Sequence, residues 1–180
     1  MIPRVVHLVY LGFSGTMSEE WATNVERWAE CLSERGNEWT LKLWGNSTNW
    51  PAKYKDRVNN HLTMFEESQY NAYKTTYNGY KNNVERADFI RYVILHHDGG
   101  VYTDMDVYPT TKNIDLGPLL QTFEQFTNVQ TLWAESSNMR NVTTNSFFAN
   151  ASGAPFLRTI LDTAVARASK KYSTRHMGIM

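Results

Sequence analysis

Hydrophobic positions along this chain follow two patterns that alternate from the N-terminus to the C-terminus. Short apolar runs are typical of buried strands, and they occupy residues 2–10, 39–44, 101–108, 129–135 and 146–149. Apolar residues at three- and four-residue intervals are typical of half-buried helices, and they mark residues 16–36, 51–68, 84–97, 116–126 and 154–170. Residues 70–83 have weak periodicity and predict a loop. The alternation predicts an α/β sandwich with a mixed, mainly parallel sheet flanked by helices.

The segment from residue 84 to residue 108 carries the most informative pattern. Its first part predicts a helix whose inward face holds Val84, Ala87, Ile90, Val93 and Ile94. Gly99 and Gly100 end that helix, because glycine most readily adopts the left-handed conformation found just past a helix C-terminus. A strand then begins at Val101. Since side chains alternate across a strand, Asp104 and Asp106 are predicted to share one face.

Four charged residues in this segment suggest a chemistry. Asp88 and Arg91 lie three positions apart on the predicted helix, so an acceptor and a forked donor could meet the hydroxyls of one sugar together. Asp104 and Asp106 would repel each other unless a cation lay between them. Such oxygen ligands select Mg²⁺ or Mn²⁺, which usually keep waters and share the phosphates of a substrate. The sequence therefore predicts a metal site for a sugar nucleotide.

An isolated Asp-x-Asp is often only a solvated strand end. Here the apolar strand, the preceding Gly99-Gly100 turn and the charged helix upstream favour the metal site over that simpler interpretation.

Composition limits the remaining possibilities. A chain of 180 residues with 42% hydrophobic content can bury one substantial core, so we expect a single catalytic domain over residues 1–180, or a fragment of a longer protein. Basic and acidic residues are equal in number, which argues against a nucleic-acid partner. Cys31 is the only cysteine, which excludes an internal disulfide. The absence of a signal-peptide pattern and of a transmembrane segment predicts a cytoplasmic protein.

Several segments resemble the family 32 glycosyltransferases, which carry an Asp-x-Asp signature, and more distantly the clostridial glucosylating toxins. They are residues 2–10, Leu43-Trp44, Ala87-Asp-x-x-Arg-Tyr92, Gly99-Gly-Val-Tyr-x-Asp-x-Asp106, and Asn145 followed by Gly153-Ala-Pro-Phe-Leu157. The resemblance implies the GT-A fold, with a Rossmann-like nucleotide-binding core. The small chain is similar to bacterial or large-DNA-virus members, and a viral member would work in the cytoplasm of its host.

The resemblance also implies roles for residues around the Asp-x-Asp motif. Asp106 would be the principal metal ligand, and Asp104 would hold the ribose of the donor or a metal-bound water. Asp88 and Arg91 would hold hydroxyls of the transferred sugar. Family members usually have a later segment that adds another metal contact, and His176 could take that role here.

The rest of the implied donor site comes from other parts of the chain. Tyr10 stands where the family commonly has Trp, and it would stack on the nucleotide base, with Leu8 and Val9 lining that pocket. Tyr102 and Asn145 would flank the sugar and its phosphates.

These observations predict a metal-dependent, retaining glycosyltransferase that uses Mn²⁺ or Mg²⁺. It would move a hexosyl or deoxyhexosyl group from a nucleoside-diphosphate sugar to a hydroxyl of a glycan or glycoprotein acceptor. UDP is expected first because Tyr10 and the toxin-like block suit uracil, and GDP second because family 32 includes mannosyltransferases.

Two other functions compete with this interpretation. A haloacid-dehalogenase-like phosphatase would use Asp104 as its nucleophile, but it needs a downstream acidic pair, and Glu135 and Asp162 each stand alone. A non-catalytic carbohydrate-binding module would rely on the six Trp and ten Tyr residues, most of which we expect in the core.

Overall fold

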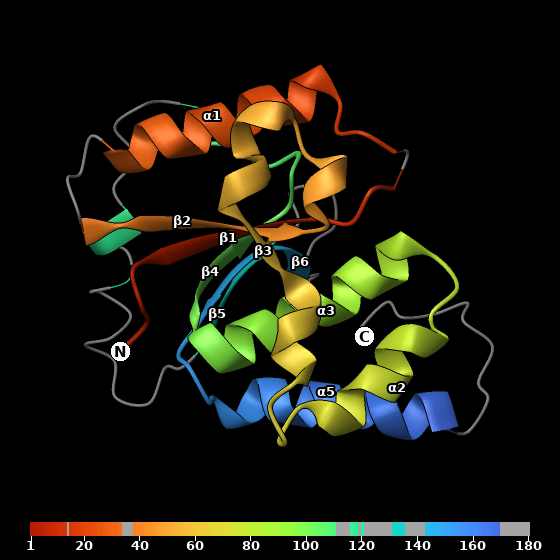
Figure 1. Ribbon diagram of the computed structural model, residues 1–180. Helices are drawn as coiled ribbons and strands as arrows, with labels where there is room; N and C mark the ends of the chain where they lie inside the picture. Colours follow the sequence, from red (N-terminus) through yellow and green to blue (C-terminus); the bar gives the residue numbers. More distant parts are fainter. Residues whose placement is uncertain are drawn as a thin grey trace.

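A mixed six-stranded sheet lies between two layers of helices (Figure 1). The computed structural model describes residues 1–13, 15–33, 38–110, 116–118, 120, 131–135 and 143–169. The strands are β1 (Val5–Tyr10), β2 (Thr40–Gly45), β3 (Val58–Asn60), β4 (Gly100–Thr103), β5 (Thr131–Glu135) and β6 (Thr143–Asn150). The helices are α1 (Glu19–Ser33), α2 (Asn71–Gly79), α3 (Asn83–Asp98) and α5 (Pro155–Ser169), with short 3-10 turns η2 (Ser47–Asn49), η3 (Ala52–Arg57) and η4 (His61–Phe65).

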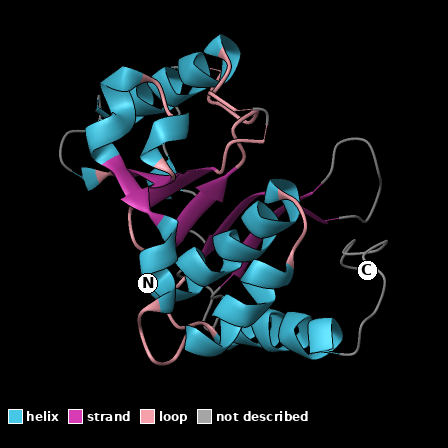
Figure 2. Cartoon of the chain, turned by 45° about the vertical axis from the view of Figure 1, so that its right-hand side comes forward, coloured by secondary structure: helices cyan, strands magenta, loops and turns pink. Residues whose placement is uncertain are grey.

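The hydrophobic core is divided by the sheet into two clusters. Helix α1 covers one face, where Val25 and Trp28 pack with Leu8 and Leu43. Helices α2, α3 and α5 gather on the other face (Figure 2), where the buried apolar residues include Val9, Ile90, Ile94, Phe148, Leu157 and Leu161. Because successive residues of β1 point to opposite faces, its apolar run supplies side chains to both clusters.

The order of the strands is β3-β2-β1-β4-β6-β5. Strand β1 pairs in parallel with β2 and β4, while β6 pairs antiparallel with both β4 and β5. The mixed, mainly parallel sheet predicted from the sequence is therefore confirmed. Leu8 pairs with Thr103, so β1 and β4 end at the same edge of the sheet. That edge, beyond the carboxyl ends of parallel strands, is where open α/β sheets usually bind ligands.

The helix predicted over residues 51–68 is wrong. The chain there forms η3, the short edge strand β3 and then η4. Val58 pairs with Leu43 in parallel register, and the Asn59 side chain donates to the backbone oxygen of Leu43 at 3.0 Å. Leu62, assigned to the inward stripe of that helix, is 42% exposed. Strand pairing with β2 outweighed the local helical spacing, as tertiary contacts often do for short polar segments.

The loop predicted over residues 70–83 is also wrong, because α2 fills most of it. Tyr70, Tyr73, Tyr77 and Tyr80 recur at steps of three and four residues, and all four are buried. Their rings pack with Phe65 and Phe89, and the Tyr73 hydroxyl donates to Asp162 of α5 at 2.7 Å. The helical period was present in the sequence, but it was carried by tyrosines, whose bodies are apolar and whose hydroxyls are polar.

Smaller differences concern the ends of elements. Val84 was placed on the inward face of its helix, but it is 57% exposed on the first turn of α3. Strand β4 stops at Thr103, so Asp104 and Asp106 are not alternating strand residues. Of the helix predicted over residues 116–126, only residues 116–118 and 120 are described, and they are helical.

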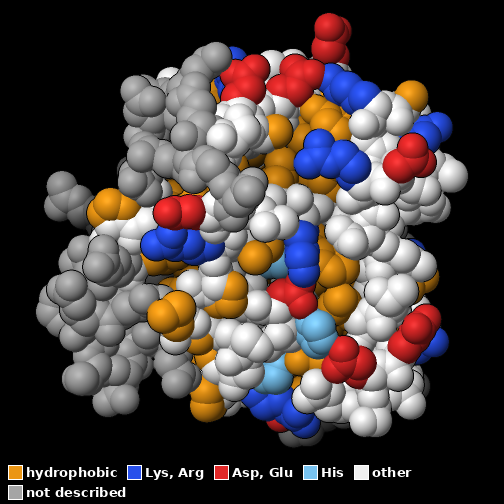
Figure 3. Space-filling view, turned by 60° about the vertical axis from the view of Figure 1, so that its left-hand side comes forward, with side chains coloured by type: hydrophobic (Ala, Val, Ile, Leu, Met, Phe, Trp, Pro, Cys, Tyr) orange, Lys and Arg blue, Asp and Glu red, His pale blue; other side chains and the backbone are white. Residues whose placement is uncertain are grey.

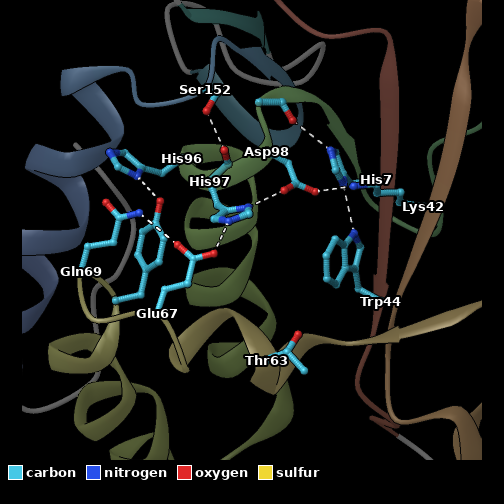
Figure 4. A network of polar contacts seen from close by, with 12 residues as sticks. His7, Lys42, Trp44, Thr63, Glu67, Gln69, His96, His97, Asp98 and Ser152 are labelled. Atoms are coloured by element: carbon cyan, nitrogen blue, oxygen red, sulfur yellow. Dashed lines mark hydrogen bonds and ion pairs between the residues drawn. The ribbon is translucent and has the colours of Figure 1, made fainter.

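A closed polar network holds the C-terminal end of α3 at the edge opposite to the candidate site (Figure 4). Asp98 contacts Lys42 through Oδ2 at 2.8 Å and His97 through Oδ1. His97 also contacts Glu67 at 2.6 Å. Burial alone would raise the pKa of Asp98, but hydrogen bonds from Lys42 and His97 lower it below its usual value. In the view that brings the left side of Figure 1 forward, basic, acidic and histidine side chains lie one below another from the centre of the face toward its lower edge (Figure 3).

His7 extends this network into the core. Its Nδ1 accepts a hydrogen bond from Trp44 at 3.0 Å, and its Nε2 lies 2.9 Å from the backbone oxygen of Gly99. An acceptor at Nδ1 and a carbonyl at Nε2 require the neutral ring with its proton on Nε2. Burial lowers the pKa of His7 to about 4, against the opposing charge of Asp98. Strands β1 and β2 and the end of α3 are thus tied together by groups whose partners are all within the protein.

Candidate active site

Helix α3 places the first half of the candidate site. Its N-cap is Asn82, whose side chain accepts from the backbone N–H of Glu85 at 2.9 Å, and it ends where Gly99 takes a φ of 67°. Asp88 and Arg91 lie on the side of α3 that faces β6. The helix therefore ends at the glycine signal that the sequence predicted, and its charged pair faces the sheet edge.

Arg91 joins three segments of the site. Its side chain is only 6% exposed, and its guanidinium contacts Asp88 Oδ1 at 2.6 Å and Asp104 Oδ1 at 2.9 Å. It also donates to the backbone oxygens of Asn145 at 2.8 Å and Ala87 at 3.3 Å. A planar donor fork suits such a role, because one side chain can meet several acceptors at fixed angles. Arg91 thus fixes the positions of two carboxylates that come from α3 and from the end of β4.

Each of these two carboxylates keeps one oxygen unused within the described part of the chain. Asp88 Oδ1 receives Arg91 and, at 3.4 Å, the side-chain amide of Asn145. Asp104 Oδ1 receives Arg91 and the hydroxyl of Tyr102, the latter at 2.6 Å. The contacts described for Asp88 and Asp104 do not involve Oδ2 of either residue, and their side chains are 33% and 29% exposed. Among the described residues, the two fixed carboxylates are therefore contacted through one oxygen each, which leaves the other oxygen for a ligand.

The electrostatic environment of Asp104 favours an added cation. Burial raises the pKa of Asp104, while Arg91 and Tyr102 lower it and the charges of Asp106 and Asp88 raise it again, so that the pKa lies above its usual value. Ionised Asp104 is therefore under-compensated by the protein alone. A divalent cation would relieve that condition, because an opposite charge within a few ångströms favours the ionised form.

Asp106 lies in the turn that follows β4, and it is exposed. The turn is fixed by two backbone hydrogen bonds. The N–H of Asp104 donates to the backbone oxygen of Ser146 at 2.7 Å, and the N–H of Val107 donates to the backbone oxygen of Asp104 at 3.1 Å. The predicted sharing of one strand face is wrong, because β4 ends at Thr103 and Asp106 lies two residues beyond Asp104 in the turn.

The described residues hold no group of three or more His, Cys, Asp or Glu side chains placed to bind a metal ion. The donor set at this edge is a pair of hard oxygen ligands. That set fits Mn²⁺ or Mg²⁺ of the kind that keeps several waters and binds through substrate phosphates, and it does not fit a metal site made by the protein alone. His176, predicted as a tentative metal ligand, lies outside the described residues.

Tyr102 and Asn145, predicted to flank the sugar, both belong to the support of the carboxylates. Tyr102 is 1% exposed, and the Arg91 guanidinium lies over its ring at 4.5 Å from the centroid. Asn145 is half-buried at the start of β6, where its amide reaches Asp88. Of these two side chains, only Asn145 is placed to meet a ligand directly.

Leu8, Val9 and Tyr10, predicted to form the base pocket, are fully buried, with exposed fractions of 1%, 2% and 0%. Leu8 and Tyr10 face the α1 side of the sheet, and Val9 faces the α3 side. Their backbone reaches the edge of the sheet where β4 also ends, but none of the three side chains presents a surface to a nucleotide in this structure. The stacking role of Tyr10 remains a prediction without a visible stacking face.

Asn83 was missed by the sequence analysis. It is the first residue of α3, and its side-chain amide donates to the backbone oxygens of Leu11 at 2.7 Å and Gly12 at 3.3 Å. The bond fixes the loop after β1 against the helix that carries Asp88. A short polar residue at a helix start was the only available signal, and it is more often a cap than a bridge to another segment.

Comparisons with known proteins identify the family and the fold of this chain. The family described as a glycosyltransferase sugar-binding region containing a DXD motif matches residues 18–127. The chain is 33% identical over 166 residues to inositol phosphoceramide mannosyltransferase 3 of Schizosaccharomyces pombe, a match that covers 89% of this chain and 36% of that protein. The chain thus spans about a third of the length of this curated relative.

Two solved structures share the fold. The PaToxG glycosyltransferase has a TM-score of 0.65 at 14% identity, covering 96% of this chain and 64% of that one. The UDP-bound glycosyltransferase domain from the YGT toxin has a TM-score of 0.59 at 11% identity, covering 93% and 62%. The GT-A fold expected from the sequence is therefore confirmed. Since the family match takes in more than half of its residues, this chain belongs to the DXD-containing glycosyltransferases of the family 32 type.

Proposed function

We propose that residues 1–180 form one catalytic domain, which transfers a hexosyl or deoxyhexosyl group from a nucleoside-diphosphate sugar to a hydroxyl of a glycan or glycoprotein acceptor. The observation that carries the proposal is the arrangement around Arg91, where the described contacts hold Asp88 and Asp104 by one oxygen each and leave the other oxygen for a ligand. Preorganised groups of this kind cost little reorganisation when a substrate arrives.

The residues take the following roles. Asp104 and Asp106 hold Mn²⁺ or Mg²⁺, and the free oxygen of Asp88 accepts a hydroxyl of the transferred sugar. Arg91 and Tyr102 hold Asp104 in place through its Oδ1 atom, and the side-chain amide of Asn145 positions Asp88. When bound, the cation supplies charge neutralisation for the diphosphate leaving group.

We favour a UDP-sugar as the donor and give a GDP-sugar as the second choice. The UDP-bound domain of the YGT toxin supports UDP, and the mannosyltransferase of Schizosaccharomyces pombe supports a hexose as the transferred group. We propose retention of the anomeric configuration, because the family resemblance implies it. The family match argues against both the phosphatase and the non-catalytic module as alternatives.

A donor panel tests this function. The wild-type protein is incubated with UDP-glucose, UDP-galactose, UDP-N-acetylglucosamine, GDP-mannose and GDP-fucose, with Mn²⁺, with Mg²⁺ or with a chelator, and nucleotide release is measured. We expect release from one donor class, dependent on the cation, and proton NMR of the freshly formed product should give the anomeric configuration of the donor. Release of phosphate from simple phosphomonoesters, without any release of nucleotide, would contradict the proposal.

A further inference from the structure

Helix α1 reaches the turn that carries Asp106, although it covers the face of the sheet opposite to α3. The side-chain amide of Asn24 donates through Nδ2 to the backbone oxygen of Met105 at 3.0 Å. The indole N–H of Trp28 donates to the backbone oxygen of Val107 at 2.9 Å. Two side chains one helical turn apart on α1 therefore hold the backbone oxygens of the residues just before and just after Asp106.

Asn24 is a polar residue on the buried side of α1. It is 3% exposed, while the other buried residues of this helix are apolar. A buried amide costs free energy unless its hydrogen bonds are made. The oxygen of this amide accepts only a long bond from Arg27, at 3.4 Å, whereas its nitrogen makes the shorter bond to Met105. The donor side of Asn24 therefore serves the turn after β4.

Asp106 has a peptide plane on each side, and both planes are held. The preceding plane contains the Met105 oxygen, to which Asn24 donates. The following plane contains the N–H of Val107, which donates to the backbone oxygen of Asp104 at 3.1 Å. Because a peptide unit is planar, fixing both planes fixes the direction in which the Asp106 side chain leaves the backbone. Among the described contacts, only the bond from Asn24 holds the first plane.

The chain beyond Asp106 is also held by α1. Trp28 fixes the plane that contains the Val107 oxygen, and the Arg27 guanidinium lies over the ring of Tyr108, 4.3 Å from its centroid. Asp106 itself is exposed, and the described hydrogen bonds and ion pairs include none to its carboxylate. The direction of this carboxylate therefore depends on the backbone that α1 holds.

From these contacts we propose that Asn24 and Trp28 are positioning residues for the metal site, because they fix the backbone that directs the carboxylate of Asp106. The inference rests on the proposed function, which assigns Asp106 to the metal. Groups that orient a metal ligand change metal affinity when they are removed, although they do not touch the metal. Through these two side chains, the helix on one face of the sheet prepares a site whose other carboxylate is held by α3.

The experiment compares two tryptophans that each lose one hydrogen-bond donor. Trp28→Phe removes the N–H that reaches Val107. The matched control, Trp44→Phe, removes the N–H that reaches His7 in the network at the opposite edge (Figure 4). Both tryptophans are 3% exposed. Asn24→Leu removes the amide and keeps about the same volume. UDP and GDP are titrated into each protein with and without Mn²⁺, and hydrogen exchange over residues 103–108 is measured without metal or nucleotide.

We expect Asn24→Leu and Trp28→Phe each to weaken Mn²⁺-dependent nucleotide binding about tenfold, as is typical when the support of a metal ligand is lost. Exchange over residues 103–108 should become faster in both variants. Trp44→Phe should match the wild type in both measurements. Thermal melts establish that each protein is folded at the assay temperature, and Trp28→Phe alone decides the matter if Asn24→Leu does not fold.

Wild-type affinity for the nucleotide with Mn²⁺ in Trp28→Phe, even with faster exchange, would overturn the inference and leave the proposed function standing. Equal weakening in Trp44→Phe would also overturn it, because the loss of a buried N–H would then act through general stability. Failure of the wild type to bind either nucleotide, with Mn²⁺ present, would overturn the proposed function and this inference together.

Discussion

Asp98 and Asp104 stand at the two ends of β4, and they differ in what the protein provides for them. Asp98 has both oxygens occupied, by His97 and Lys42, and its pKa is lowered. Among the described residues, Asp104 is contacted through Oδ1 alone, and its pKa is raised. The first carboxylate belongs to a completed network that stabilises the fold. The second lacks compensation that a cation and a substrate would supply, which is the usual property of a functional carboxylate.

The largest effect is expected at Asp104. Asp104→Asn keeps the shape and removes the charge, so donor turnover should fall roughly 100-fold or more, the size typical of lost electrostatic stabilisation. Because the raised pKa means that ionised Asp104 disfavours folding above its unfolded pKa, the melting temperature should stay equal or rise. Steady-state kinetics and calorimetric melting measure both. A variant that keeps its activity, or that melts several degrees lower, would place Asp104 with Asp98 as a structural residue.

Arg91→Lys tests whether the forked guanidinium of Arg91 is needed to orient the carboxylates of Asp88 and Asp104. A lysine retains the charge, but it cannot meet Asp88, Asp104 and the Asn145 oxygen at the same time. We expect turnover to fall about 10- to 100-fold, as for other residues that orient ligating groups. The decrease should appear mainly in kcat, with the far-ultraviolet circular dichroism spectrum unchanged. Wild-type kcat in Arg91→Lys would show that charge alone is sufficient.

Asp98→Asn is the matched substitution at the other end of the strand. It should lower the free energy of unfolding by about 1–3 kcal/mol, since charge-assisted hydrogen bonds to Lys42 and His97 are weakened inside a partly buried site. Turnover and nucleotide affinity should be those of the wild type when measured well below the melting temperature. Denaturant unfolding and the kinetic assay together check this. A tenfold loss of kcat without loss of stability would remove the distinction between the two ends of β4.

The smallest effect concerns pH. Burial disfavours the charge on His97, but hydrogen bonds to Asp98 and Glu67 raise its pKa overall. The stabilisation is therefore fully present below the unfolded pKa of about 6.5, and it is lost as pH rises through the higher folded pKa. The melting temperature of the wild type should decrease by roughly 1–3 °C over that range relative to His97→Gln. If the melting temperatures of the two proteins changed with pH in parallel, His97 would contribute no pH-dependent stabilisation.

His7 gives the opposite sign at lower pH. With a folded pKa of about 4, its neutral form contributes stability that is complete above 6.5 and declines as pH falls toward 4. Asp98 also contributes stability, because its pKa is lower in the folded than in the unfolded protein. That contribution is lost at still lower pH, as the pH falls below the unfolded value and through the folded one.

The sequence predicted the segment from Asp88 to Thr103 well because its signals are local. Helical spacing, a Gly-Gly stop and an apolar strand together place Asp88, Arg91 and Asp104 at one edge of the sheet. The contacts that give these residues their character are not local. Arg91 donates to the backbone oxygen of Asn145 in β6, and Asn83 of α3 donates to the backbone oxygens of Leu11 and Gly12. No spacing rule reports such contacts.

Misassigned segments share a physical cause as well. Residues 51–68 have a helical pattern, yet parallel pairing of Val58 with β2 draws them into an edge strand. Residues 71–79 look polar, yet their tyrosines bury rings and leave hydroxyls near polar partners such as Asp162 and His61. The buried state of Tyr10 follows the same rule, since an aromatic residue at a strand end can serve either a ligand or a core.

The most direct test of this account is a calorimetric titration of UDP and GDP, with and without Mn²⁺, into the wild type, Asp106→Ala and Asp98→Asn. We expect Mn²⁺-dependent binding of one nucleotide to the wild type and to Asp98→Asn, and loss of that binding in Asp106→Ala. Binding that ignores both the metal and Asp106→Ala, or that is lost equally in Asp98→Asn, would contradict the assignment of the metal-nucleotide site to the end of β4.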